Sequence, residues 1–124
     1  MKGGLLPRGP RRRRPPAAAS GNVVALVRVR IERALARRER YRYVQPRVEP
    51  EGQGWKVVSP NCSRNIDPEG RDIDIAWLEP ATDGLWLLHA RDHAGNCWRL
   101  EGEGLTLTEA LQRICADPLR VYWP

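Results

Sequence analysis

Apolar side chains recur at helical spacing near the start of the chain. Residues 24–40 read as a helix with one apolar face, formed by Val24, Val27, Ile31, Ala34 and Leu35. Arginines occupy the remaining faces, which is the pattern of a helix that lies on a core and exposes its other side to water. The alternation of valine and arginine over residues 27–31 also fits a strand, so the first turns stay open to either assignment.

The middle of the chain changes to the alternation that is typical of antiparallel strands. We expect strands over residues 47–49, 55–59, 72–78, 85–91 and 97–101. Within 72–78, strict alternation predicts that Ile73, Ile75 and Trp77 share one buried face, opposite Asp72 and Asp74. The segment 85–91 is apolar on both faces, which favours a central strand whose two faces are both covered by other parts of the chain.

A second helix is predicted near the end of the chain, because residues 106–109 (Thr-Leu-Thr-Glu) form a capping-box motif. Its apolar stripe comprises Leu107, Ala110, Leu111, Ile114 and Cys115. Asp117-Pro118 ends the helix, and the tail over residues 121–123 is expected to fold back onto the body. Together these elements predict an α+β fold. It consists of an N-terminal helix, a four- or five-stranded antiparallel meander and a C-terminal helix packed on the sheet, with both helices on one face.

Charge divides the chain into two parts. The first fifty residues carry 14 basic and 3 acidic side chains, whereas the other 74 carry 7 basic and 12 acidic ones. Residues 1–22 lack apolar periodicity and are rich in Gly, Pro and Arg, which predicts a disordered arm ahead of a single small α+β domain over 23–124. The alternative is that translation begins near Val23, and the native protein then lacks this arm.

Composition also indicates where in the cell the protein is expected. No stretch approaches the roughly 20 apolar residues of a membrane span, so we expect no membrane partner. The three cysteines are odd in number and lack tandem spacing, which is typical of reduced thiols rather than of a disulfide framework. We therefore expect a cytoplasmic protein.

The sequence contains only weak candidates for a metal site or a catalytic nucleophile. His89, His93 and Cys97 recur at four-residue intervals, but a turn at residues 94–95 would place His89 and Cys97 on opposite faces of a hairpin. The loop over 65–70 resembles the start of a calcium site, yet its twelfth position is Ala76 instead of a carboxylate. We therefore expect no metal and no cofactor. Cys62 is the best candidate nucleophile, but no nucleophile-elbow motif surrounds it, so a non-enzymatic protein is favoured.

A loop between two strands is the first candidate binding surface. It gathers many hydrogen-bonding groups within eleven residues, and the candidate binding residues are Asn61, Cys62, Ser63, Arg64, Asn65, Asp67 and Arg71. A polar loop held by a rigid sheet can bind a ligand or partner. The alternative is a solvated crossover in which the Asn and Asp side chains only cap turns.

The arginines supply a second candidate surface. If the protein binds nucleic acid, the residues expected to contact phosphate are Arg11, Arg12, Arg13, Arg14, Arg30, Arg33, Arg37 and Arg38. The chain has no helix-turn-helix, zinc-finger or RNA-recognition signature, and a solvated helix face explains the same charges. The sequence therefore predicts an accessory or interaction module with an unknown protein partner. The alternative function is nucleic-acid binding through the basic arm and first helix.

The five tryptophans are expected to serve mainly as core residues. Trp86 falls on the opposite strand face from Leu85 and Leu87, so the pattern leaves one ring partly exposed. An exposed tryptophan on a sheet could stack a base or anchor a protein partner.

Overall fold

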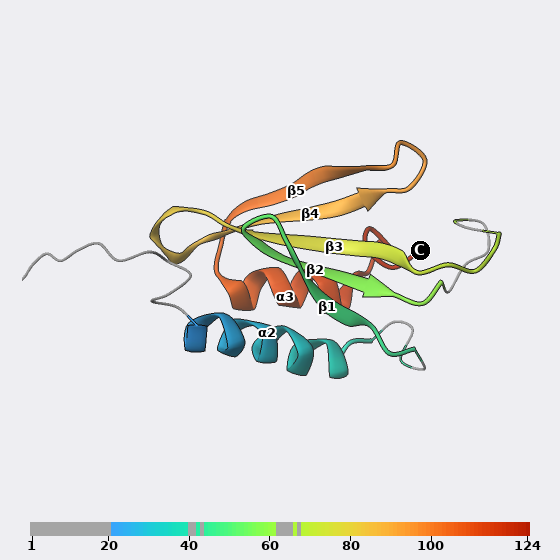
Figure 1. Ribbon diagram of the computed structural model, residues 1–124. Helices are drawn as coiled ribbons and strands as arrows, with labels where there is room; N and C mark the ends of the chain where they lie inside the picture. Colours follow the sequence, from blue (N-terminus) through green and yellow to red (C-terminus); the bar gives the residue numbers. More distant parts are fainter. Residues whose placement is uncertain (1–20, 40–41, 43, 62–65, 67) are drawn as a thin grey trace, which may run out of the picture.

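The computed structural model describes residues 21–39, 42, 44–61, 66 and 68–124. Its elements are α2 (Gly21–Ala36), β1 (Arg47–Glu51), β2 (Gly54–Ser59), β3 (Ile73–Pro80), the short helix η1 (Thr82–Gly84), β4 (Trp86–Asp92), β5 (Cys97–Leu105) and α3 (Leu107–Ala116). The five strands form one antiparallel sheet in the order β1-β2-β3-β4-β5. Both α-helices lie on the same face of this sheet (Figure 1). The predicted α+β fold is confirmed.

Helix α2 begins earlier and ends earlier than the sequence pattern indicated. The strand alternative for residues 27–31 is wrong, because Ile31 and Leu35 lie four residues apart on one helical face and are almost fully buried. The predicted arm over residues 1–22 lies outside the described residues, apart from Gly21 and Asn22, which form the start of α2. Among the residues that the structure describes, neither α-helix combines the length and the apolar character that a membrane span requires.

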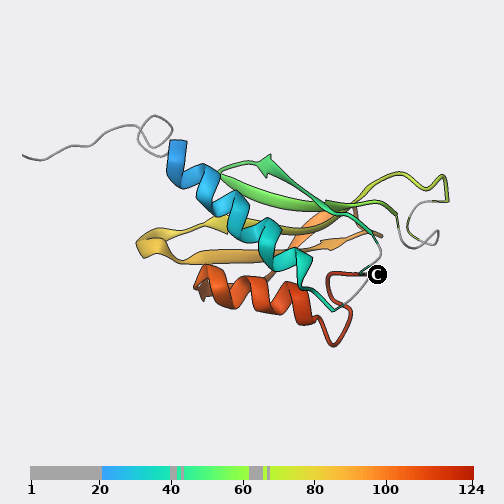
Figure 2. The ribbon, with the colours of Figure 1, turned by 90° about the horizontal axis from the view of Figure 1, so that it is seen from below.

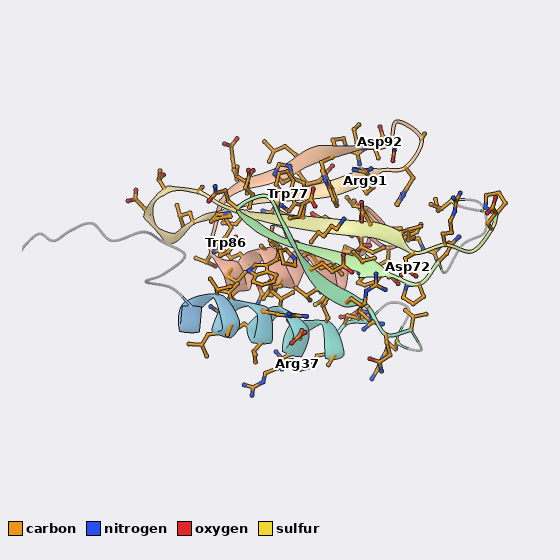
Figure 3. The ribbon with its side chains drawn as sticks, in the orientation of Figure 1. Arg37, Asp72, Trp77, Trp86, Arg91 and Asp92 are labelled. Atoms are coloured by element: carbon orange, nitrogen blue, oxygen red, sulfur yellow. The ribbon has the colours of Figure 1, made fainter. Side chains whose placement is uncertain are left out.

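A bulge in β3 overturns the predicted position of Trp77. The pairing of β3 with β2 passes from Ala76 to Asp74 and skips Ile75. Ile75 and Ala76 are consecutive and both fully buried, so the alternation changes phase between them. Trp77 therefore lies on the face of the sheet that is turned away from the helices, where its ring stacks on His89 at a centroid distance of 4.5 Å (Figure 3).

Helix α3 has the start that its sequence predicted. The Thr106 hydroxyl accepts a hydrogen bond from the Glu109 amide at 3.1 Å, and the Glu109 carboxylate accepts one from the Thr106 amide at 2.9 Å. These two bonds satisfy amides that the first helical turn leaves without partners. The pKa of the Glu109 carboxylate is lowered, first by its hydrogen bond with the Thr106 backbone amide and then by the Thr106 side chain, because both favour the charged form.

The C-terminal tail folds back onto the core, as expected. Trp123 is fully buried, and its indole nitrogen donates to the Ile114 carbonyl at 2.9 Å. The buried carboxylate of Asp117 accepts hydrogen bonds from three consecutive tail amides, at Val121 (2.7 Å), Tyr122 (3.1 Å) and Trp123 (2.8 Å). The tail is therefore part of the layer that holds α3 against the sheet.

Candidate functional site

The two α-helices lie next to each other on the sheet (Figure 2). Side chains of both helices line a groove of about 560 Å³. The lining residues come from both helices and from the residue after α2: Arg30, Arg33, Ala34, Arg37, Thr108, Leu111, Gln112 and Cys115. The helices meet closely near their C-terminal ends, where the Cys115 thiol donates to the Ala34 carbonyl at 3.3 Å. They diverge toward their N-terminal ends (Figure 2).

Helical spacing explains why three arginines line this groove. Arg30, Arg33 and Arg37 follow one another at intervals of three and four residues, which places them on one side of the helix, one turn apart. The opposite side of α2 carries Ile31 and Leu35 into the core, so the orientation of the helix is fixed. Figure 3 shows Arg37 directed away from the sheet. Three of the residues predicted for nucleic-acid binding are thus brought together.

The groove has an apolar floor and a basic rim. Leu111 is buried and Ala34 is half-buried, whereas Arg30, Arg33 and Arg37 are exposed. Arg30 reaches across the groove and donates to the Thr108 hydroxyl at 2.9 Å. Among the described residues, no histidine or carboxylate belongs to the lining.

The three groove arginines differ from the paired arginines elsewhere on the surface. Arg28 pairs with Glu32, Arg47 with two carboxylates and Arg99 with Glu101. Within the described part of the chain, no carboxylate forms an ion pair with an arginine of the groove. Their guanidinium groups are therefore available to an anionic partner.

The thiol in the groove is not activated. Burial raises the pKa of Cys115, and this effect outweighs the opposing effect of the nearby Arg38 and Arg37 charges. The thiol is therefore protonated at neutral pH and is a poor nucleophile.

Arg38 has a different role from the other arginines in the predicted set. Its side chain is only 4% exposed and donates to the carbonyls of Leu35 (2.8 Å) and Val44 (2.6 Å). Its guanidinium also lies over the Trp123 ring at 5.0 Å from the centroid. Arg38 thus joins the end of α2 to the buried tail and does not face a ligand. Arg11, Arg12, Arg13 and Arg14 lie outside the described residues.

Two of the seven residues predicted to form a binding loop belong to the described part of the chain. Cys62, Ser63, Arg64, Asn65 and Asp67 lie outside the described residues, while Asn61 is half-buried and Arg71 is exposed. Neither Asn61 nor Arg71 lines the groove between the helices.

A smaller cavity of about 210 Å³ adjoins the loop. It is lined by Ile66, Asp72, Ile73, Asp74, Arg91, His93 and Asn96. Its charged groups already have partners. Arg91 donates to the Asn96 side chain at 2.7 Å and lies 3.8 Å from Asp74, while Asp72 pairs with Arg47 outside the cavity. The pKa of His93 is lowered, first by burial and then by the Arg91 charge, so this imidazole is neutral at pH 7.

Sequence reasoning missed an aromatic cluster on the other face of the sheet. Trp77 stacks on His89 and contacts Trp98 at 5.9 Å between centroids, and Arg91 lies over Trp98 at 4.9 Å. His89 also contacts Glu79 at 3.2 Å. These rings stack on one another and are interspersed with charges of both signs.

Trp86, which the pattern left partly exposed, is half-buried and packs against the hydrophobic core. Figure 3 places it between the sheet and the helices. Trp86 is thus partly exposed, as are Trp77 and Trp98 on the open face of the sheet.

The predicted register of the last hairpin is confirmed. His89 pairs with Leu100 and Cys97 pairs with Asp92, so the His89 and Cys97 side chains lie on opposite faces of the sheet. Within the described ranges, no cluster of three or more His, Cys, Asp or Glu side chains could hold a metal ion.

Residues 20–124 match the family model described as "Domain of unknown function (DUF3024)". The chain belongs to the DUF3024 family. This match includes α2, the whole sheet, α3 and the tail, so the groove lies within the DUF3024 domain. No curated protein and no solved structure matches the chain.

Proposed function

We propose that this DUF3024 protein is a non-enzymatic interaction module that binds an acidic segment of a partner protein in the groove between α2 and α3. One observation carries the proposal: Arg30, Arg33 and Arg37 form a row on one side of α2 without carboxylate partners among the described residues. Cationic side chains placed in this way attract an anionic surface and fix its orientation.

The lining of the groove favours binding over catalysis. Histidine and carboxylates are the side chains that most often act as general acids and bases, and the lining contains neither. The one thiol, Cys115, has a raised pKa. The groove therefore offers hydrogen-bond donors and apolar surface, which are the components of a recognition site.

The apolar floor favours a protein partner over a nucleic acid. A phosphate backbone would satisfy the guanidinium groups but would leave the exposed part of Ala34, and the side chain of Leu26 on the same side of α2 as Arg30, without an apolar contact. The alternative, nucleic-acid binding through the same arginines, depends on charge alone at this surface. Exposed ion pairs are worth up to about 1 kcal/mol each, so three of them without further contacts give weak binding.

The test is a comparison of two triple variants. In the groove variant, Arg30, Arg33 and Arg37 are each replaced by Gln. In the control variant, Gln replaces Arg47, Arg99 and Arg120, which are exposed and lie outside the groove. The two variants therefore lose the same net charge. Fluorescence anisotropy measures the binding of a labelled acidic peptide and of a labelled single-stranded oligonucleotide at two salt concentrations.

We expect the groove variant to lose about tenfold or more in affinity for the acidic peptide, because a loss of about 1.4 kcal/mol corresponds to a factor of ten. The control should lose less than about threefold. Equal losses in the two variants would contradict a specific site. Tight oligonucleotide binding that depends on the groove, without peptide binding, would identify the nucleic-acid alternative as the function.

A further inference from the structure

We propose that the segment bound in the groove is an acidic amphipathic helix of the partner, which lies along α2 with its apolar side facing the groove floor. This inference rests on the proposed function and specifies its partner. It depends on the shape of the groove, on its apolar surface and on the spacing of its charges.

The shape of the groove suits a third helix. α2 and α3 are in close contact near Ala34 and Cys115 and diverge toward their N-terminal ends (Figure 2). At the wider end the contact between the helices is made by the long side chain of Arg30, which reaches Thr108. A groove between two helices, open on its outer side, is the surface that binds a helix in the helix-in-groove mode of recognition.

The apolar surface extends beyond the groove floor. Leu26 lies four residues before Arg30 on the same side of α2, and it is 62% exposed. Leu26 lies outside the groove lining, in which Leu111 is buried and Ala34 is half-buried. The apolar surface that a partner can cover therefore consists of Leu26 and the exposed part of Ala34. An extended acidic chain or a phosphate backbone would leave this surface in water, whereas one apolar side of a helix can cover it.

The charges have the spacing of a helix. Leu26, Arg30, Arg33 and Arg37 form a row that spans twelve residues, or about 16 Å, along α2 and the residue that follows it. A helix that lies alongside presents its own side chains at the same interval of three or four residues. Glutamates at that interval can therefore meet the three arginines in register, while leucines on the adjacent face contact the floor.

The experiment compares three synthetic peptides of about 14 residues with equal numbers of glutamates. The first carries leucine at helical spacing, the second replaces each leucine by glutamine, and the third keeps the leucines but contains a central proline that breaks the helix. Binding to the full chain is measured by fluorescence anisotropy. Circular dichroism reports whether the first peptide gains helix on binding.

We expect the first peptide to bind at least tenfold more tightly than the other two and to become more helical in the complex. Leu26→Gln should weaken this binding several-fold. Leu119→Gln, at a position that is 84% exposed and does not line the groove, should leave the binding unchanged. Both substitutions affect exposed side chains, so the protein is expected to fold in each case.

The outcomes separate this inference from the proposed function. Equal binding of all three peptides, with dependence on Arg30, Arg33 and Arg37, would overturn the helical partner and leave an acidic segment as the ligand. Equal effects of Leu26→Gln and Leu119→Gln would also overturn it. Binding of none of the peptides, or binding that is insensitive to the three arginines, would overturn the proposed function as well.

Discussion

The carboxylate of Asp117 organises the C-terminal tail, and its removal should destabilise the whole layer beneath the sheet. Asp117 is 1% exposed and accepts hydrogen bonds from the amides of Val121, Tyr122 and Trp123. Truncation to alanine leaves these amides without the carboxylate, and those of Tyr122 and Trp123 are buried. Trp123 contacts Arg38 at the end of α2, so the loss of stability that follows displacement of the tail extends to this neighbouring helix.

The magnitude follows from the hydrogen bonds. A buried donor without a partner costs about 1–3 kcal/mol, so two of them give about 4 kcal/mol for Asp117→Ala. Alanine also has to adopt the left-handed conformation of this position, where φ is 38°. Asp117→Asn keeps one acceptor oxygen and tolerates that conformation, so a smaller loss of about 2 kcal/mol is expected.

Urea unfolding followed by circular dichroism at pH 7 measures these free energies of unfolding. Glu103→Ala, which removes an exposed carboxylate from β5, is the matched control and should change stability by less than about 0.5 kcal/mol. If Asp117→Ala does not fold, Asp117→Asn still provides the measurement. A change below about 0.5 kcal/mol in both Asp117 variants would refute the reasoning.

Three other predictions concern backbone space and ionisation. Gly54→Ala should prevent folding, because an added Cβ would lie 1.9 Å from the Leu78 carbonyl oxygen. Gly102→Ala should be less destabilising, since the nearest contact of its added Cβ is a flexible arginine side chain at 2.8 Å. Thermal unfolding compares the stability of the two variants. Burial raises the pKa of Tyr122 to about 12, so the folded state keeps a proton that the unfolded state loses near pH 10. Stability should therefore fall as pH rises through this window, and Tyr122→Phe should reduce the fall. The pKa of Glu109 is lowered by its hydrogen bonds with Thr106 in the capping box. The ionised carboxylate therefore stabilises the fold fully above its unfolded pKa near 4.5, and this stabilisation is lost as pH falls through its lower pKa in the folded state. Urea unfolding from pH 7 to 3 should show a smaller acid-induced loss of stability in Glu109→Gln than in the native chain.

The features that sequence predicted well are local. The start of α3 depends on Thr106 and Glu109, which are three residues apart, and the register of the last hairpin depends on the turn between β4 and β5. In both cases the interacting residues are close in sequence, so a short motif specifies the geometry.

The position of Trp77 could not be obtained from alternation alone. The bulge at Ile75 arises from pairing with β2, which is distant in sequence, and it reverses the faces of all later residues in β3. One signal was present: Leu78 follows Trp77, and strict alternation would have exposed that leucine, which the structure buries fully.

The groove could be predicted in part. The sequence named Arg30, Arg33 and Arg37 among the residues expected to contact phosphate. It could not show that Thr108 and Leu111 of α3 form the facing wall. That relation depends on how two helices pack on a shared sheet, which no local motif encodes. Arg38 was grouped with the other arginines for its charge, whereas its burial depends on the folded tail.

The most direct test of the account is to map the binding surface by backbone amide chemical shifts. The full chain, labelled with nitrogen-15, is titrated with the leucine-containing acidic peptide. We expect the largest chemical-shift changes on α2 and α3, from Leu26 to Arg37 and from Thr108 to Cys115. Shift changes that centre instead on Trp77, His89 and Trp98, on the open face of the sheet, would contradict a binding site between the helices.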